Sequence, residues 1–205
     1  MLEYREVIGV DEVGRGPLFG EVVAAAVYIK DSSLEIFNQI NDSKKLTEKK
    51  REKIYDELIN NPNIIYSVGI ADEKEIDEIN ILNATFLAMK RALEKLEKLL
   101  KEDGINLKEK LVLVDGNKLI REYDGKQEFL IKGDSKDLSI ATASIIAKVT
   151  RDNMMLEYDK IYPKYSLKSH KGYPTKKHYE AIEKYGILDK HRKSFLKKIL
   201  NDIKQ

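Results

Sequence analysis

Short apolar runs rich in valine and isoleucine occur five times along the chain, and each is bounded by polar or glycine residues. Runs of this length and composition are typical of β-strands. The first two runs are separated only by a glycine-rich turn, so we expect them to pair as a hairpin. The predicted strands are residues 6–10, 22–29, 64–70, 111–115 and 129–132.

A second pattern, with apolar side chains every three or four residues, predicts amphipathic helices between the strands. It is clearest at Leu82, Phe86, Met89, Leu93, Leu96 and Leu100. The three long predicted helices are residues 47–59, 79–100 and 138–158. Beyond Pro163, glycines and a proline divide the chain into two shorter helices.

Strands that alternate with helices indicate an α/β layer with a mixed sheet. A chain of 205 residues is long enough for one core, since domains commonly contain roughly 100 to 200 residues. We therefore expect a single domain, residues 1–205, with a mixed five-stranded sheet flanked by helices. A C-terminal helical segment, about residues 161–205, is expected to pack on it.

The charge of the chain is unevenly distributed. The net charge is only +2, but from Ile161 onward there are 12 Lys and Arg against 4 Asp and Glu. All three histidines and five of the eleven tyrosines also lie in this segment. Interleaved cations and aromatic rings suit a nucleic-acid backbone. A solvated helical face is the alternative explanation.

Composition excludes several classes of protein. Without cysteine, the chain has no disulfide, no thiolate nucleophile and no thiolate metal site. No apolar run is long enough to cross a bilayer, and the N-terminal residues do not resemble a secretory leader. We therefore expect a cytoplasmic protein with no membrane association.

Four acidic residues stand at or just after the ends of predicted strands: Asp11, Glu12, Asp115 and Asp134. Neighbouring strands lie about 5 Å apart, so carboxylates at their ends can converge. Converging carboxylates repel one another unless a cation lies between them. Oxygen ligands without histidine or cysteine favour Mg²⁺ or Mn²⁺. Two such ions about 3.5 to 4 Å apart can promote a phosphoryl displacement.

Each acid also has an ordinary explanation. Asp134 precedes an apolar helix and could cap its N-terminus. Asp115 is followed by glycine, as in a turn. Asp11 and Glu12 point to opposite faces of a strand unless the chain turns at Glu12. Gly14 and Gly16 allow such a turn at little conformational cost, because glycine adopts positive φ without steric strain. Arg15 could form an ion pair with either acid.

Gly14, Gly16 and Gly20 also invite comparison with a dinucleotide-binding turn. That turn requires a helix immediately after it, with the phosphate at the helix N-terminus. Here residues 21–29 predict a strand, and the glycine spacing differs. We therefore reject a nicotinamide-binding site. A measurement of NAD binding tests this alternative, and the absence of binding would exclude it.

Seven distinctive blocks of sequence are spread over nearly the whole chain. They are GVDEVGRGPLFGEVVAAAV at 9–27, DSKKLT at 42–47, ILNATFLAM at 81–89, VDGN at 114–117, KGDSKDLSIATASIIAKVTRD at 132–152, KGYPT at 171–175 and HRKSF at 191–195. Together, and in this order, they resemble the ribonuclease HII family.

The resemblance implies an RNase H-like fold and an endonuclease that uses two Mg²⁺ or Mn²⁺ ions. Its substrates would be the RNA strand of RNA/DNA hybrids and single ribonucleotides embedded in duplex DNA, cut on the 5′ side. The products would carry a 5′-phosphate and a 3′-hydroxyl, as ribonucleotide removal and RNA primer removal require. The family's catalytic and metal-binding acids fall on Asp11, Glu12, Asp115 and Asp134.

The resemblance also implies which residues bind the substrate. Its Gly-Arg-Gly element falls on Gly14, Arg15 and Gly16, whose backbone could approach a 2′-hydroxyl closely because glycine has no side chain. Its junction-sensing tyrosine falls on Tyr173, for which a buried core position is the alternative. Residues near the nucleic-acid backbone would be Lys44, Ser139 and Lys171.

Further expectations concern the C-terminal segment and the sister family. Cations of the segment would hold phosphates, namely Lys176, Lys177, Arg192 and Lys193. His170 and His191 would either donate to phosphate or be structural. Ribonuclease HIII has another residue in place of Arg15, a glutamate as its last acid and an added N-terminal domain, so the resemblance is to HII.

Three residues of the first block depart from the family's common alanine, alanine and proline, and we expect them to affect packing more than ligand binding: Val13, Phe19 and Glu21. A nucleic-acid-binding module without catalysis is the competing function, and we expect a monomer.

Overall fold

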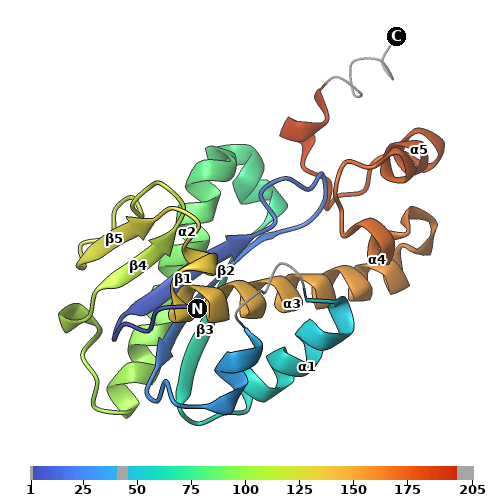
Figure 1. The fold of residues 1–205 in the computed structure, drawn as a ribbon. Coiled ribbons are helices and arrows are strands. Elements are labelled where there is room, and N and C mark those ends of the chain that lie inside the picture. Colours follow the sequence, from blue (N-terminus) through green and yellow to red (C-terminus); the bar gives the residue numbers. More distant parts are fainter. Residues whose placement is uncertain (1, 41–45, 198–205) are drawn as a thin grey trace.

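The computed structural model describes residues 2–40 and 46–197. Its five-stranded sheet has the order β3-β2-β1-β4-β5 (Figure 1). The β1–β2 and β2–β3 pairs are antiparallel, while β4 is parallel to both β1 and β5. The predicted hairpin and mixed sheet are therefore confirmed. The strands are β1 Ile8–Val13, β2 Val22–Ile29, β3 Ile64–Ala71, β4 Val112–Asp115 and β5 Gln127–Leu130.

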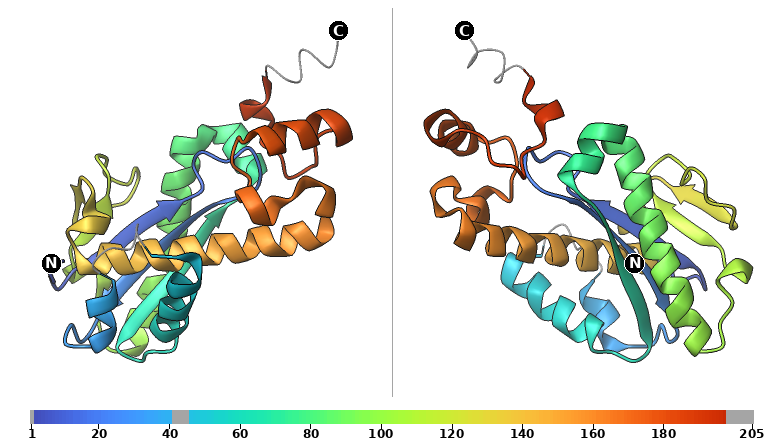
Figure 2. Two further views of the ribbon diagram at one scale, coloured as in Figure 1. Left: turned by 45° about the vertical axis from the view of Figure 1, so that its right-hand side comes forward. Right: turned by 180° about the vertical axis from the view of Figure 1, so that it is seen from behind.

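Helices cover both faces of the sheet, with α2 on one side and α1 and α3 on the other (Figure 2). The α-helices are α1 Glu48–Ile59, α2 Glu73–Glu102, α3 Leu138–Ile161, α4 Leu167–His170 and α5 Lys176–Tyr185. Short 3₁₀ helices are η1 Glu35–Gln39, η3 Leu107–Glu109, η4 Gly133–Ser135, η5 Pro163–Tyr165 and η6 Lys193–Phe195.

Strand β2 explains the run of three alanines in the sequence. Ala24 and Ala26 belong to the core beneath α2, while Ala25 belongs to the core beneath α1 and α3. All eight residues of β2 are buried because helices cover both faces of the strand. Small side chains at these positions let the helices approach closely. A Cβ on Gly9 of neighbouring β1 would lie 2.2 Å from the Ser139 carbonyl carbon in α3.

Helix α2 begins six residues earlier than predicted. Asp72 and Glu75 form a capping box at its N-terminus. The helix is then interrupted at Asn80, whose φ of 65° and ψ of 163° are not helical. The Asn80 side chain accepts hydrogen bonds from the backbone N–H groups of Leu82 and Asn83, so it caps the longer part of the helix.

The C-terminal elements lie beside the β1–β2 turn and have a small core of their own (Figures 1 and 2). Phe19 from that turn is fully buried in this core, together with residues such as Tyr165 and Ile182. The two predicted short helices are found as α4 and α5. No described helix is long and apolar enough to cross a membrane.

Candidate active site

The parallel pairing of β1 with β4 brings two of the predicted acids to one edge of the sheet. Val10 is in register with Val114, and the next residue in each strand is Asp11 or Asp115. Glu12 follows Asp11 in β1, and its backbone N–H donates to Asp11 Oδ1 at 2.7 Å. Asp134 lies in η4, directly after Gly133, whose N–H donates to Asp115 Oδ1 at 2.6 Å.

The four carboxylates influence one another electrostatically. Burial raises the pKa of Asp11 well above its usual range, and the charges of Glu12 and Asp115 raise it further. Burial also raises the pKa of Glu12, although the Arg15 guanidinium opposes this shift. Burial raises the pKa of Asp115, and the Asp134 charge adds to the effect. Bringing these groups together therefore concentrates negative charge in a partly desolvated place.

The donor chemistry at this edge fits a hard divalent cation. The four acids supply only oxygen ligands, and a cation among them would offset the charges that raise their pKa values. Among the described residues, however, no three His, Cys, Asp or Glu side chains are grouped closely enough to hold one ion together. The carboxylates are neighbours around a common edge rather than a closed ligand shell.

A cavity of about 160 Å³ adjoins these acids, between α2 and the turn after β4. Glu12 and Asp115 line it, together with Phe86 of α2 and Lys118 of the turn. Arg15 also lines it and forms the expected ion pair with Glu12, at 3.3 Å. Glu12 and Asp115 therefore face a cleft, whereas Asp11 and Asp134 are buried beside it.

The N-cap explanation for Asp134 is wrong. Asp137 caps α3 instead, because its carboxylate accepts hydrogen bonds from the backbone N–H groups of Ser139 and Ile140. The turn explanation for Asp115 is compatible with the site, since Gly116 turns the chain with a φ of 103° while the Asp115 carboxylate points toward Gly133.

Two buried arginines hold the glycine-rich turn from behind. The Arg192 guanidinium donates to four backbone carbonyls, at 2.6 to 3.2 Å: those of Gly14, Arg15, Pro17 and Gly20. The predicted phosphate contact of Arg192 is therefore wrong, since this side chain is fully buried. Burial lowers its pKa to about 9, so Arg192 remains a cation at neutral pH.

Arg151 of α3 makes the second set of contacts. Its guanidinium donates to the carbonyls of Phe19, Glu21 and Lys171, at 2.9 to 3.0 Å. A Cβ on Gly14 would lie 2.4 Å from Arg151 Nε, and Gly14 has a φ of 96°. Glycine is therefore required at this position by both the close approach and the backbone conformation. This role of Arg151 could not be predicted from the sequence, because an arginine in a helix resembles a surface cation.

The turn and the predicted tyrosine lie side by side. A Cβ on Gly16 would lie 3.5 Å from Tyr173 Cε1, and the Tyr173 side chain is exposed rather than part of the core. The core alternative for Tyr173 is therefore wrong. Arg15 and Gly16 are thus exposed on the same side as Tyr173, next to the acids of β1, while Gly14 is buried against Arg151.

The three histidines form a buried cluster that supports Tyr173. The Leu188 N–H donates to His191 Nδ1, so His191 carries its proton on Nε2 and donates it to His178 Nε2 at 3.2 Å. His178 then donates from Nδ1 to the Tyr173 carbonyl at 3.0 Å. His170 stacks on His178 at 4.4 Å between ring centroids. The structural explanation for His170 and His191 is confirmed.

The remaining predicted substrate residues are dispersed. Lys171 lies two residues before Tyr173, and its ammonium pairs with Glu48 at 3.0 Å. Ser139 is fully buried beneath Gly9, and its hydroxyl has no hydrogen-bond partner within the described chain. Lys44 lies outside the described residues. The side chains of Lys176, Lys177 and Lys193 are exposed, as phosphate contacts would require.

Two of the three departures from the family pattern are buried in packing. The Phe19 ring contacts Tyr158 and His191 edge to face. The Glu21 carboxylate accepts a hydrogen bond from the Tyr158 hydroxyl at 2.5 Å. It also forms an ion pair with the Lys190 ammonium at 3.1 Å. These contacts support the turn without reaching the acids.

Comparisons with known proteins identify the family that this chain matches. A family model described as Ribonuclease HII matches residues 8–198. Ribonuclease HII of Fusobacterium nucleatum is 59% identical over 200 residues, which are 97% of this chain and 89% of the relative. The crystal structure of ribonuclease H2 from Pyrococcus horikoshii has a TM-score of 0.67 and 29% identity, covering 92% of each chain. Bst-RNase HIII in complex with Mn²⁺ shares the fold, with a TM-score of 0.67 and 18% identity, covering 88% of this chain and 63% of the other.

Replacing Arg192 by methionine should destabilise the protein strongly. The change leaves four buried carbonyls without their donor, and each orphaned acceptor costs about 1 to 3 kcal/mol. We expect the free energy of unfolding in urea to fall by more than about 3 kcal/mol. Lys193→Met is the matched control and should change it by less than about 0.5 kcal/mol. An unchanged urea midpoint for Arg192→Met would show that the hydrogen bonds from Arg192 to the turn carbonyls do not stabilise the protein.

The histidine cluster should resist protonation in the folded protein. Burial lowers the pKa of His178 and of His191 from 6.5 to about 4. The unfolded chain therefore takes up these protons near pH 6.5 and the folded chain only near pH 4, so the two histidines reduce stability as the pH falls between these values. Raised carboxyl pKa values act in the opposite direction, so the rings should be observed directly by NMR. Ring resonances that titrate near pH 6.5 would refute the buried cluster.

Proposed function

The chain belongs to the ribonuclease HII family, and from this premise we propose that Asp11, Glu12, Asp115 and Asp134 are its catalytic and metal-binding residues. The protein is a ribonuclease H, an endonuclease that hydrolyses the RNA strand of RNA/DNA hybrids. The observation that supports the assignment of residues is the convergence of these acids at one sheet edge, where burial and neighbouring negative charges raise the pKa values of Asp11, Glu12 and Asp115.

The cofactor proposal follows from the ligand chemistry. The family depends on a divalent metal, and we propose two Mg²⁺ or Mn²⁺ ions held by the four acids, since all the available ligands are oxygen atoms. When bound, such ions supply an activated water and stabilise the charge on the leaving oxygen. The Mn²⁺ complex of Bst-RNase HIII supports a divalent ion at this fold.

The glycine-rich turn is proposed to recognise the ribose. The carbonyls of Gly14 and Arg15 point inward to Arg192. Because a trans peptide places its N–H opposite its carbonyl, the N–H groups of Arg15 and Gly16 point the other way. Two backbone donors are thereby offered to a 2′-hydroxyl, which accepts hydrogen bonds and is absent from DNA.

Tyr173 is proposed to sense the junction after the ribonucleotide. Its exposed ring next to Gly16 could stack on the following sugar, where a 2′-hydroxyl would crowd it. This arrangement supports incision on the 5′ side of a single embedded ribonucleotide, with 5′-phosphate and 3′-hydroxyl products. Lys171 and the exposed lysines of the C-terminal segment would contact phosphates. Lys44 and Ser139 remain predictions, and the burial of Ser139 limits it to an indirect role.

We also propose that residues 1–205 act as one domain and as a monomer in the cytoplasm, where replication and repair supply the substrate. The basic segment from about residue 161 would be an integral part of this domain. The arginine contacts between that segment and the β1–β2 turn support this proposal.

The first test is cleavage of an end-labelled DNA duplex that contains one ribonucleotide, with and without Mg²⁺ or Mn²⁺. We expect a metal-dependent cut immediately 5′ to the ribonucleotide and none in an all-DNA duplex. If the folded protein cut neither this duplex nor an RNA/DNA hybrid, it would be a binding module and the catalytic assignment would fail.

Asp11→Asn should abolish cleavage while leaving duplex binding largely intact. A metal site contributes several kcal/mol to the barrier, so the expected loss of rate is on the order of a thousandfold or more. Asp56→Asn, at an exposed position of α1, is the matched control and should cleave normally. Full activity of Asp11→Asn would show that Asp11 is not a metal ligand.

A further inference from the structure

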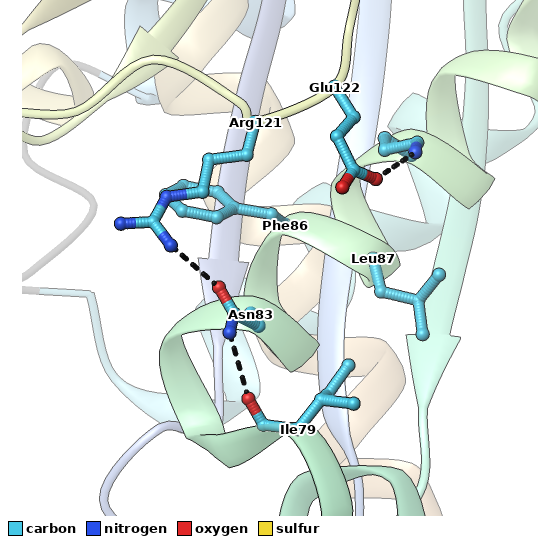
Figure 3. A pocket seen from close by; sticks show the side chains of 7 residues that line it. Ile79, Asn83, Phe86, Leu87, Arg121 and Glu122 are labelled. Atoms are coloured by element: carbon cyan, nitrogen blue, oxygen red, sulfur yellow. Dashed lines mark hydrogen bonds and ion pairs between the residues drawn. The ribbon is translucent and has the colours of Figure 1, made fainter.

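A second cavity adjoins the one beside the acids. Both are lined by Phe86, and the second, of about 350 Å³, lies between α2 and the loop after β4. Its other lining residues include Asn83, Lys90, Arg121 and Glu122 (Figure 3). The cleft that begins at Glu12 and Asp115 therefore extends along α2.

Arg121 is held in this extension by neutral groups. Its Nη1 donates to Asn83 Oδ1 at 3.1 Å, and its guanidinium carbon lies 5.8 Å from the Phe86 ring centroid (Figure 3). The Asn83 amide nitrogen donates to the Ile79 carbonyl, which turns the amide oxygen toward Arg121. Arg121 forms no ion pair with any residue of the described chain. By contrast, the neighbouring Lys90 is paired with Glu122.

The loop that carries Arg121 is braced. The Gln127 side chain accepts from the Ile120 N–H and donates to the carbonyls of Ile120 and Tyr123. The Ile120 side chain is buried in the core beneath α2. The backbone at Glu122 is left-handed, with a φ of 55°. The left-handed backbone of Glu122 is uncommon for a residue other than glycine, and the three hydrogen bonds of the Gln127 side chain hold the loop in this conformation. The loop conformation in turn sets the direction of the Arg121 side chain.

We propose that Arg121, oriented by Asn83 and Phe86, binds a backbone phosphate of the nucleic-acid substrate. A guanidinium presents a planar fork of donors that matches phosphate oxygens. Its partners orient the fork without neutralising its charge, which leaves the charge for an anionic ligand. Lys118 lines the intervening cavity and likewise forms no ion pair with a described residue, so positive charge continues toward the acids.

This inference rests on the proposed function, because it assumes that a nucleic-acid strand passes the acids of β1 and β4. Figures 1 and 2 show the loop after β4 on one side of β1 and the C-terminal elements on the other. The duplex would then be held on both sides of the cut, near Tyr173 on one side and by Arg121 on the other.

The test is the salt dependence of duplex binding, measured by fluorescence anisotropy without divalent metal so that no cleavage occurs. Each phosphate contact contributes about 0.9 to the slope of log K against log salt concentration. We expect Arg121→Gln to reduce the slope by about that amount, equally for all-DNA and ribonucleotide-containing duplexes. Arg121→Lys should retain most of the slope, because the positive charge is kept.

Two further variants separate binding from folding. Lys108→Gln removes one exposed charge before β4, at the opposite end of that strand from Asp115, and should leave the slope unchanged. Asn83→Asp places a carboxylate against Arg121, so it should weaken duplex binding although it adds an ion pair within the protein. A purely structural role for Arg121 predicts no such loss.

The outcomes distinguish this inference from the proposed function. Wild-type protein that binds no duplex and cuts none would overturn the proposed function. Wild-type binding with an undiminished slope in both Arg121→Gln and Asn83→Asp would overturn only the phosphate subsite.

Discussion

The parallel pairing of β1 with β4 places Asp11 and Asp115 at the same edge of the sheet, although more than a hundred residues separate them along the chain. Folding therefore brings like charges together in a partly buried place, which the rest of the protein must stabilise. Helices on both faces supply the apolar burial that offsets this repulsion. The small residues of β1 and β2 let those helices approach, so the carboxylate edge depends on a tightly packed sheet.

A second constraint is the shape of the turn between β1 and β2. Pairing of β1 with β2 ends at the Val13–Val23 pair, so the carbonyls of the turn have no partners in the ladder between these strands. Arg192 and Arg151 supply those partners from elements far along the chain. A buried guanidinium can satisfy several carbonyls at once because it carries five donors in a fixed plane. The C-terminal segment thus completes a loop that begins at the strand carrying Asp11 and Glu12.

Much of this arrangement could be predicted from the sequence, because strand composition and helical periodicity are local. The five strands, the hairpin and the acids at strand ends follow from such patterns. The choice between Asp134 and Asp137 as the α3 cap could not, since both stand before the helix and only the three-dimensional path of the chain decides. The burial of Arg192 was also hidden, because it lies between a histidine and a lysine and resembles a surface cation. Partners of that kind are set by tertiary contacts rather than by neighbours in sequence.

The Arg192 contact with Gly14 joins residues 178 positions apart, and this separation has a consequence for protein synthesis. A chain still on the ribosome can contain all four acids by residue 134 and yet lack the guanidinium that fixes the turn. The turn can therefore take its clamped conformation only after residue 192 has been synthesised and has left the exit tunnel.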